Sequence, residues 1–243
     1  QAWRRGPMQF NSLLFRGLLL LPLFLAMSIP PGLTLNENGW VFKQDSARYG
    51  RLTCYVTKTR FRMDAMDLRL HIKAPFKMIS MYNTDTRLKY SISVESIAER
   101  LGLRKPTDKD RKAGTREVLR MTEKRTIAGF DCQGYASEHV KANKQVIPRL
   151  KIYATKALDL PKSMEYACAR LTDCPPGIGF PLRLQYFESY TDETTRKRGY
   201  RLSQLLNTLK AEQTNLDDSI FKEPTGFKSA RDETEIIMGG TTF

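Results

Sequence analysis

Apolar and polar residues alternate along two runs of the chain with the period of two that is typical of strands with one buried face. The first run, 55–63, sets aromatic, threonine and methionine side chains against mostly basic ones, and the second, 68–73, sets aliphatic side chains against basic ones. Two further runs, 78–82 and 87–92, flank the polar sequence Asn83-Thr84-Asp85-Thr86, which favours a hairpin turn. The pattern therefore predicts an antiparallel sheet with one apolar face and one strongly basic face.

The rest of the chain adds two helices and more strands. Residues 94–105 fit a short amphipathic helix that ends at Gly102. A second helix is predicted over 161–171, where proline occupies a first-turn position. Strand patterns return at 126–140, 147–154, 181–190 and 200–214. We therefore predict a single α+β domain over residues 34–243, dominated by an antiparallel sheet.

The first 33 residues have the composition of an export signal. Arg4, Arg5 and Arg16 are the only charged residues among them, and an apolar run follows at 18–27. A helix that spans a membrane needs roughly 20 apolar residues, and this run is about half as long. Residues 1–33 are therefore predicted to be a signal peptide or a short N-terminal membrane anchor, and the protein to be periplasmic or extracellular.

Export affects how the four cysteines are interpreted, because an oxidising compartment favours disulfides. The short spacing of Cys168 and Cys174 favours a local bridge, which leaves Cys54 to pair with Cys132. Four cysteines allow three pairings, and free thiols are an alternative. A zinc site would need close cysteine pairs, which the sequence lacks, so no metal site is predicted.

The chain is strongly basic, with 40 Lys and Arg against 26 Asp and Glu and a formal net charge of +14. Its most charged stretch, 104–125, is interpreted as a basic insertion in the domain. Each cation near an anionic membrane contributes about 1 kcal/mol to binding within a Debye length. The residues predicted to meet an anionic surface are Arg104, Lys105, Lys109, Arg111, Lys112, Arg116, Arg196, Lys197 and Arg198. The alternative is a solvated surface that keeps the protein soluble.

The sequence carries no recognised catalytic or nucleic-acid-binding motif. It lacks a nucleotide-binding loop, a Gly-x-Ser-x-Gly elbow and a metalloprotease helix. Its two histidines, His71 and His139, are not ordered with other groups into a nucleophile, a base and an orienting partner. We therefore predict no catalytic residues, no cofactor and no enzymatic activity, and nucleic acid is a disfavoured partner.

Several ordered motifs resemble an uncharacterised family of exported bacterial proteins related to the outer-membrane lipoprotein carrier. The motifs are KAPFKM at 73–78, YNT at 82–84, IAGFDCQGY at 127–135 and DSIFKEPTGFK at 218–228. The resemblance covers about residues 48–230. It implies a strongly curved antiparallel half-barrel whose concave face is covered by helices, for which 94–101 and 161–171 are the candidates.

In the carriers that this family resembles, the concave face is apolar and holds acyl chains. The carriers' own arginine switch matches no residue here, so lipoprotein transfer is not implied, and the insertion 104–125 has no counterpart. The residues predicted to line an apolar ligand pocket are Tyr55, Phe61, Leu70, Ile72, Met78, Tyr82, Tyr90, Tyr153 and Leu184. The alternative is that these residues form an ordinary packed core.

Two functional hypotheses follow. The first is an exported, non-enzymatic binding protein that holds a hydrophobic or lipid-like ligand in a β half-barrel and contacts an anionic envelope surface. The second is a structural or interaction subunit of an envelope complex, tethered by its N-terminal apolar segment. The sequence favours the first hypothesis, because each methylene buried in an apolar groove contributes about 0.8 kcal/mol to the binding of an acyl chain.

Overall fold

The computed structural model describes residues 36–100 and 116–238. The chain divides into two units, 1–33 and 34–243, and every described residue belongs to the second unit. The predicted signal or anchor lies outside the described residues. So do five of the basic residues predicted to meet an anionic surface, which are Arg104, Lys105, Lys109, Arg111 and Lys112.

The described residues form mainly β-strands. The strands are β1 (Glu37–Ser46), β2 (Gly50–Val56), β3 (Arg60–Ala65), β4 (Leu68–Lys73), β5 (Met78–Asn83), β6 (Leu88–Ser93), β7 (Arg116–Ile127), β8 (Phe130–Val140), β9 (Val146–Thr155), β10 (Phe180–Thr191), β11 (Arg198–Leu216) and β12 (Lys228–Ser229). The helices among these residues are short and are α1 (Val94–Arg100), α3 (Lys162–Leu171), the 3-10 turn η1 (Asp218–Phe221) and α4 (Glu233–Ile237).

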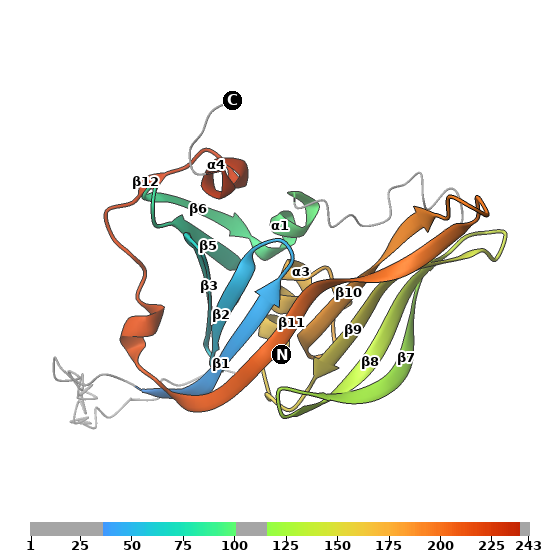
Figure 1. The fold of residues 1–243 in the computed structure, drawn as a ribbon. Coiled ribbons are helices and arrows are strands. Elements are labelled where there is room, and N and C mark those ends of the chain that lie inside the picture. The colour runs from blue at the N-terminus through green and yellow to red at the C-terminus, as the bar shows by residue number, and fades with distance from the viewer. Residues whose placement is uncertain (1–35, 101–115, 239–243) are drawn as a thin grey trace, which may run out of the picture. The chain divides into compact units, whose positions relative to one another are not determined.

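All twelve strands belong to one sheet, in the order β12-β6-β5-β4-β3-β2-β1-β11-β10-β9-β8-β7 (Figure 1). Neighbouring strands are antiparallel, except that β12 runs parallel to β6. The sheet is neither closed nor strongly curled, so the expected strongly curved half-barrel and the α+β class are corrected to a mostly β fold with an open sheet. Closure would require the two edges to pair, and β12 offers only two residues at one of them.

Most of the predicted strands are present, but two of them are each divided into two strands in the structure, 55–63 between β2 and β3 and 126–140 between β7 and β8. The predicted strand 126–140 is split between β7 and β8, because Ala128 and Gly129 have φ angles of 50° and 86° and form a tight turn. The last part of the basic stretch, residues 116–125, therefore belongs to the edge strand β7. The hairpin β5–β6 and the helix α3 lie where the pattern predicted them.

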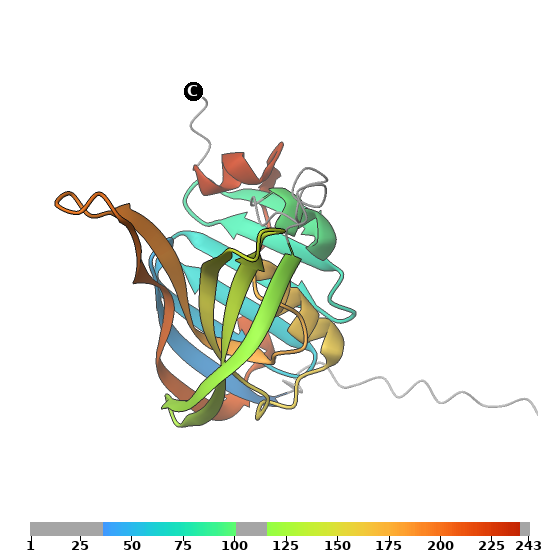
Figure 2. The same cartoon turned by 90° about the vertical axis from the view of Figure 1, so that its right-hand side faces the viewer.

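Helices α1 and α3 pack together against one face of the sheet, which we call the inner face (Figures 1 and 2). Their buried residues Ile97, Met164 and Cys168 belong to the same apolar cluster as a cross-strand row of the sheet. That row consists of Val56, Phe61, Ile72, Ile79 and Ile92, all 5% exposed or less. The helices thus cover most of this row of the inner face and form the main core with it.

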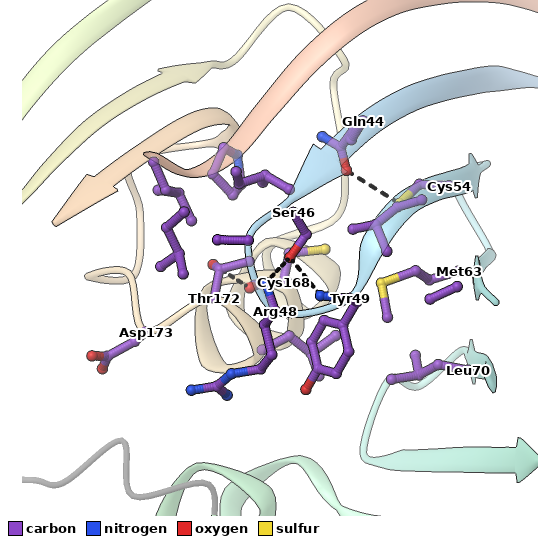
Figure 3. A pocket seen from close by; sticks show the side chains of 18 of the residues that line it. Gln44, Ser46, Arg48, Tyr49, Cys54, Met63, Leu70, Cys168, Thr172 and Asp173 are labelled. Carbon is purple, nitrogen blue, oxygen red and sulfur yellow. Dashed lines mark hydrogen bonds between the residues drawn. The ribbon is translucent and has the colours of Figure 1, made fainter. Parts of the chain in front are cut away.

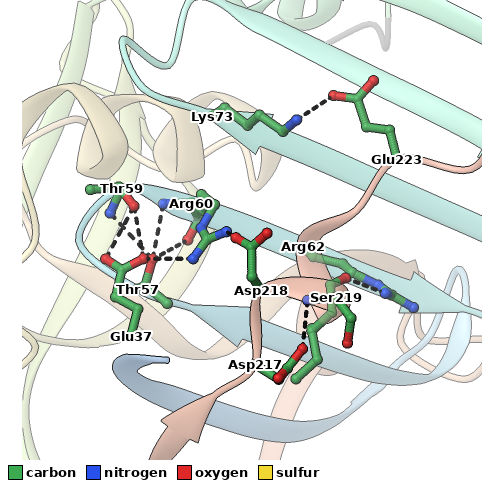
Figure 4. A network of polar contacts seen from close by, with 11 residues as sticks. Glu37, Thr57, Thr59, Arg60, Arg62, Lys73, Asp217, Asp218, Ser219 and Glu223 are labelled. Carbon is green, nitrogen blue, oxygen red and sulfur yellow. Dashed lines mark hydrogen bonds and ion pairs between the residues drawn. The ribbon is translucent and has the colours of Figure 1, made fainter. Parts of the chain in front are cut away.

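The outer face of β3 and β4 is mainly basic, as the alternation predicted, and a C-terminal segment crosses the outer face. This segment, residues 217–227, is called the C-terminal strap (Figure 4). Arg60 pairs with Glu37 at 3.1 Å and with Asp218 of the strap, and its guanidinium lies 4.5 Å from the centre of the Phe221 ring. Lys73 pairs with Glu223 of the strap at 2.9 Å. The basic side chains therefore hold the strap on the sheet.

Candidate functional site

The candidate site is a cavity of about 760 Å³ on the inner face of the sheet (Figure 3). Its lining residues come from β1–β5, from β9–β11 and from the helices α1, α3 and α4. Cavities of a few hundred Å³ or more with mainly apolar walls are the usual sites for small-molecule ligands. The cavity is therefore large enough for a ligand of drug or lipid-chain size.

Strand register explains why the wall is apolar. Cys54, Met63, Leu70 and Met81 form one cross-strand row, and Gln44, Leu52, Ala65 and Leu68 form the next. Both rows point to the inner face, because side chains in a strand alternate between its two faces. The helices cover the neighbouring row that contains Phe61, and these two rows form one wall of the cavity. Leu150, Leu184 and Leu206 lie in the part of the wall formed by β9–β11.

The buried polar groups in this wall already have partners within the protein. The Gln44 amide donates from Nε2 to Thr208 Oγ1 at 2.8 Å, and its Oε1 accepts from Cys54 Sγ at 3.3 Å. Thr208 Oγ1 donates in turn to the carbonyl oxygen of Leu182 at 2.7 Å. The side-chain nitrogen and oxygen of Gln44 thus each have a partner within the protein, and the rest of both rows is apolar, so the wall suits hydrocarbon.

Charged residues lie around the cavity at its rim. Arg48 belongs to the β1–β2 turn, where Ser46 Oγ accepts from the backbone N–H of Arg48 at 3.2 Å and of Tyr49 at 3.3 Å. Arg149 donates to Asp173 and, at 3.0 Å, to Glu117. Burial raises the pKa of the Asp173 carboxyl, and the Arg149 guanidinium opposes that shift. The rim is therefore polar where the wall is apolar.

The four cysteines are free and buried in this structure, which corrects the prediction of two disulfides. Three of the thiols donate to acceptors of their own: Cys54 to Gln44, Cys132 to the carbonyl oxygen of Phe130, and Cys174 to that of Thr172. Burial raises the pKa of Cys132 to about 11 and the pKa of Cys168 and of Cys174 to about 12. Burial also raises the pKa of Cys54, so these thiols are protonated at neutral pH and have the low reactivity of buried cysteines.

Three of the nine residues predicted to line a ligand pocket do line this cavity, namely Phe61, Leu70 and Leu184. Ile72 and Tyr153 are 1% exposed and belong to the packed core. Tyr90 packs against the same core without lining the cavity. These three residues therefore lie in or against the core and not in the wall of this cavity.

The remaining three residues of that prediction lie on the outer face or at the surface. Tyr55 pairs in register with Arg62, whose guanidinium lies 5.4 Å from the centre of its ring. Tyr82 donates to Glu223 of the C-terminal strap at 2.7 Å, and Met78 is 49% exposed. Tyr55 was misplaced because the pattern over 55–63 was taken as one strand, whereas β2 ends at Val56 and β3 begins at Arg60. On β5 the inner face carries Ile79 and Met81, so Met78 and Tyr82 point to the other face.

The described basic residues of the predicted anionic contact gather at one end of the sheet. Arg116 begins β7, opposite Val140 at the end of β8. Arg196 and Lys197 lie in the turn before β11, and Arg198 begins that strand opposite Thr191. All four are exposed, and Lys141 and Lys144 are exposed in the neighbouring β8–β9 turn. The residues share one sheet end because neighbouring strands are antiparallel.

The described residues contain no cluster of three or more His, Cys, Asp or Glu side chains arranged to hold a metal ion. Within the same residues, no helix combines the length and the apolar character needed to cross a membrane. Sequence analysis missed Gln44, Leu52, Cys54 and Arg48 as wall or rim residues. The short run Trp40-Val41-Phe42, which consists of aromatic and β-branched residues, was a strand signal that could have revealed β1.

No protein-family model matches the chain, and no curated protein matches its sequence. Among solved structures, the crystal structure of MucB is similar, with a TM-score of 0.39 and 12% identity over 79% of this chain and 59% of that chain. The crystal structure of MucB in complex with MucA(peri) gives a TM-score of 0.36 and 11% identity over 80% of this chain and 57% of that chain. This chain therefore spans less than two thirds of either solved chain.

Proposed function

We propose that this protein is an exported, non-enzymatic binding protein that holds a hydrophobic or lipid-like ligand in the inner-face cavity at the cell envelope. The observation that carries the proposal is the cavity of about 760 Å³ with its two apolar cross-strand rows. The relation to the lipoprotein-carrier family, the export signal and the contact of the basic sheet end with an anionic surface belong to the same proposal.

Binding of such a ligand is driven by the removal of hydrocarbon from water. Burying one methylene contributes about 0.8 kcal/mol, so a chain of several methylenes gains enough to offset the cost of ordering it. Met63 and Met81 lie in the middle of the wall, and methionine side chains adapt to ligands of varying shape. The wall therefore suits a flexible tail better than a rigid, polar substrate.

Native mass spectrometry of the gently purified full chain tests the proposal directly. We expect a bound amphiphile, or uptake of an added one, and we expect Met63→Trp to weaken binding by about tenfold because the indole fills part of the cavity. Met121→Trp is the matched control, because Met121 is 71% exposed and does not line the cavity. A chain that never binds an amphiphile, or a Met63→Trp chain that binds as the parent does, would contradict the proposal.

A second candidate function is an interaction subunit of an envelope complex. It is favoured by the edge strand β7, which pairs only with β8 among the described strands and exposes Leu119 and Met121. Edge strands with exposed apolar side chains are docking sites for other chains. A photo-crosslinking residue at 119 should then capture one discrete partner in cells, whereas the same residue at the exposed position 209 of β11 should not.

A further inference from the structure

The charges around the cavity specify the ligand more closely, and this step rests on the binding function proposed above. We propose that the ligand is an amphiphile with a hydrocarbon tail and an anionic head. The tail lies against the row formed by Cys54, Met63 and Leu70, and the head lies beside Arg48 on the β1–β2 turn.

The orientation of the ligand in the cavity follows from where the protein has polar groups that can bind the head. On the wall, Gln44 is bonded to Thr208 and Cys54 and its neighbours are mainly apolar, so a polar head placed there would lose hydrogen bonds to water and find few partners in exchange. At the β1–β2 turn, Ser46 is occupied in holding the backbone, and the side chains of Arg48 and Tyr49 extend from the turn (Figure 3). The head is therefore placed at the turn.

The sign of the head follows from the balance of charges. Five charged residues line the cavity: Arg48, Arg69, Arg149, Asp173 and Glu233. Arg69 lies 3.4 Å from Asp64, Arg149 pairs with Asp173 and Glu117, and Glu233 has an interaction of its own. Arg48 is exposed and forms no ion pair with any described residue. Among the described residues that line the cavity, Arg48 is thus the one charged residue without a counter-charge, and its charge is positive.

An arginine in this position suits a carboxylate or a phosphate in particular. The guanidinium presents a planar set of donors that matches two acceptor oxygens at once, and it stays charged at every physiological pH. A cationic head would meet a like charge instead. Carboxylate and phosphate heads share the chemistry that Arg48 recognises, so the experiment includes both.

The test compares four amphiphiles with the same dodecyl chain length by isothermal titration calorimetry on the full chain, below their micelle concentrations. The probes are dodecanoate, dodecyl phosphate, monododecanoylglycerol and dodecyltrimethylammonium. We expect the two anions to bind more tightly than the neutral glyceride, and the cation to bind least tightly. Arg48→Gln should weaken binding of the preferred anion by about tenfold and leave the glyceride within about twofold.

Arg51→Gln is the matched control, because Arg51 is an exposed arginine near the same turn that does not line the cavity. Equal binding of all four probes, or an Arg48→Gln chain that keeps the anion preference, would overturn the anionic-head inference and leave the binding function standing. Binding of none of the probes would overturn both. Equal melting temperatures of the variants establish that a change in affinity comes from the side chain.

Discussion

Replacing Phe42 with alanine is expected to lower the free energy of unfolding by about 3–5 kcal/mol. Phe42 is fully buried and lies at the centre of an aromatic cluster. Its ring centre lies 5.0 Å from that of Phe180, 6.1 Å from that of Phe130 and 6.2 Å from that of Trp40. The loss is large because these rings come from three different strands, β1, β8 and β10, so the space left behind cannot collapse without moving the sheet.

The measurement is urea denaturation followed by circular dichroism, with stability taken from the transition midpoint and slope. Leu209→Ala is the control, because Leu209 is 56% exposed on β11 and its truncation should change stability by about 0.5 kcal/mol or less. Total stabilities of about 5–15 kcal/mol are usual, so the Phe42 variant should fold only marginally. A loss below about 1 kcal/mol would contradict the central role given to this cluster.

Local patterning was sufficient to predict much of the antiparallel sheet. The β5–β6 hairpin was predictable because its two alternating runs are joined by a short polar turn, and every determinant lies within sixteen consecutive residues, 78–93. The alternation over 68–73 likewise placed Leu70 and Ile72 on the inner face and His71 on the outer face. Such predictions succeed because period-two alternation is a local property of the chain.

The sheet order and the cavity depend on pairings that no local pattern contains. β1 pairs with β11, so Trp40 lies opposite Gln213, far away in the sequence. The cavity likewise combines Leu52 with Leu184, Leu206 and Ile237, which come from four distant segments. The prediction of the lining therefore found Phe61, Leu70 and Leu184 but could not separate wall residues from core residues. That separation depends on which row α1 and α3 cover.

Acidification should destabilise the folded protein because of the buried side chain of His71. His71 is 2% exposed on the outer face of β4, with its ring 5.5 Å from the Tyr82 ring. Burial, followed by the nearby Arg62 and Arg69 guanidinium groups, lowers the pKa of His71 from 6.5 to about 4, against the opposing effect of Glu223 and Asp64. The folded state therefore keeps this ring neutral at a pH where the unfolded chain is already protonated.

The sign follows from proton binding. Between pH 6.5 and about 4, His71 is protonated in the unfolded state but stays neutral in the folded state. The free energy of unfolding therefore decreases as the pH falls, by about 3 kcal/mol across this pH range. The lowered pKa of the Glu223 carboxylate, which hydrogen bonds from Lys73 and Tyr82 stabilise, places its own contribution at more acidic pH. Urea denaturation at a series of pH values should show this slope in the parent chain.

The decisive quantity is the slope of the free energy of unfolding against pH, not the stability at any single pH. His71→Gln should remove most of the pH dependence between 6.5 and 4, whatever its effect at neutral pH, because glutamine does not titrate. His139→Gln, at a half-buried position of β8 away from the C-terminal strap, should retain the slope. If the His71 variant kept the full slope, another group would have to take up the proton on unfolding, and the buried ring beneath the strap would have no part in the acid sensitivity of the fold.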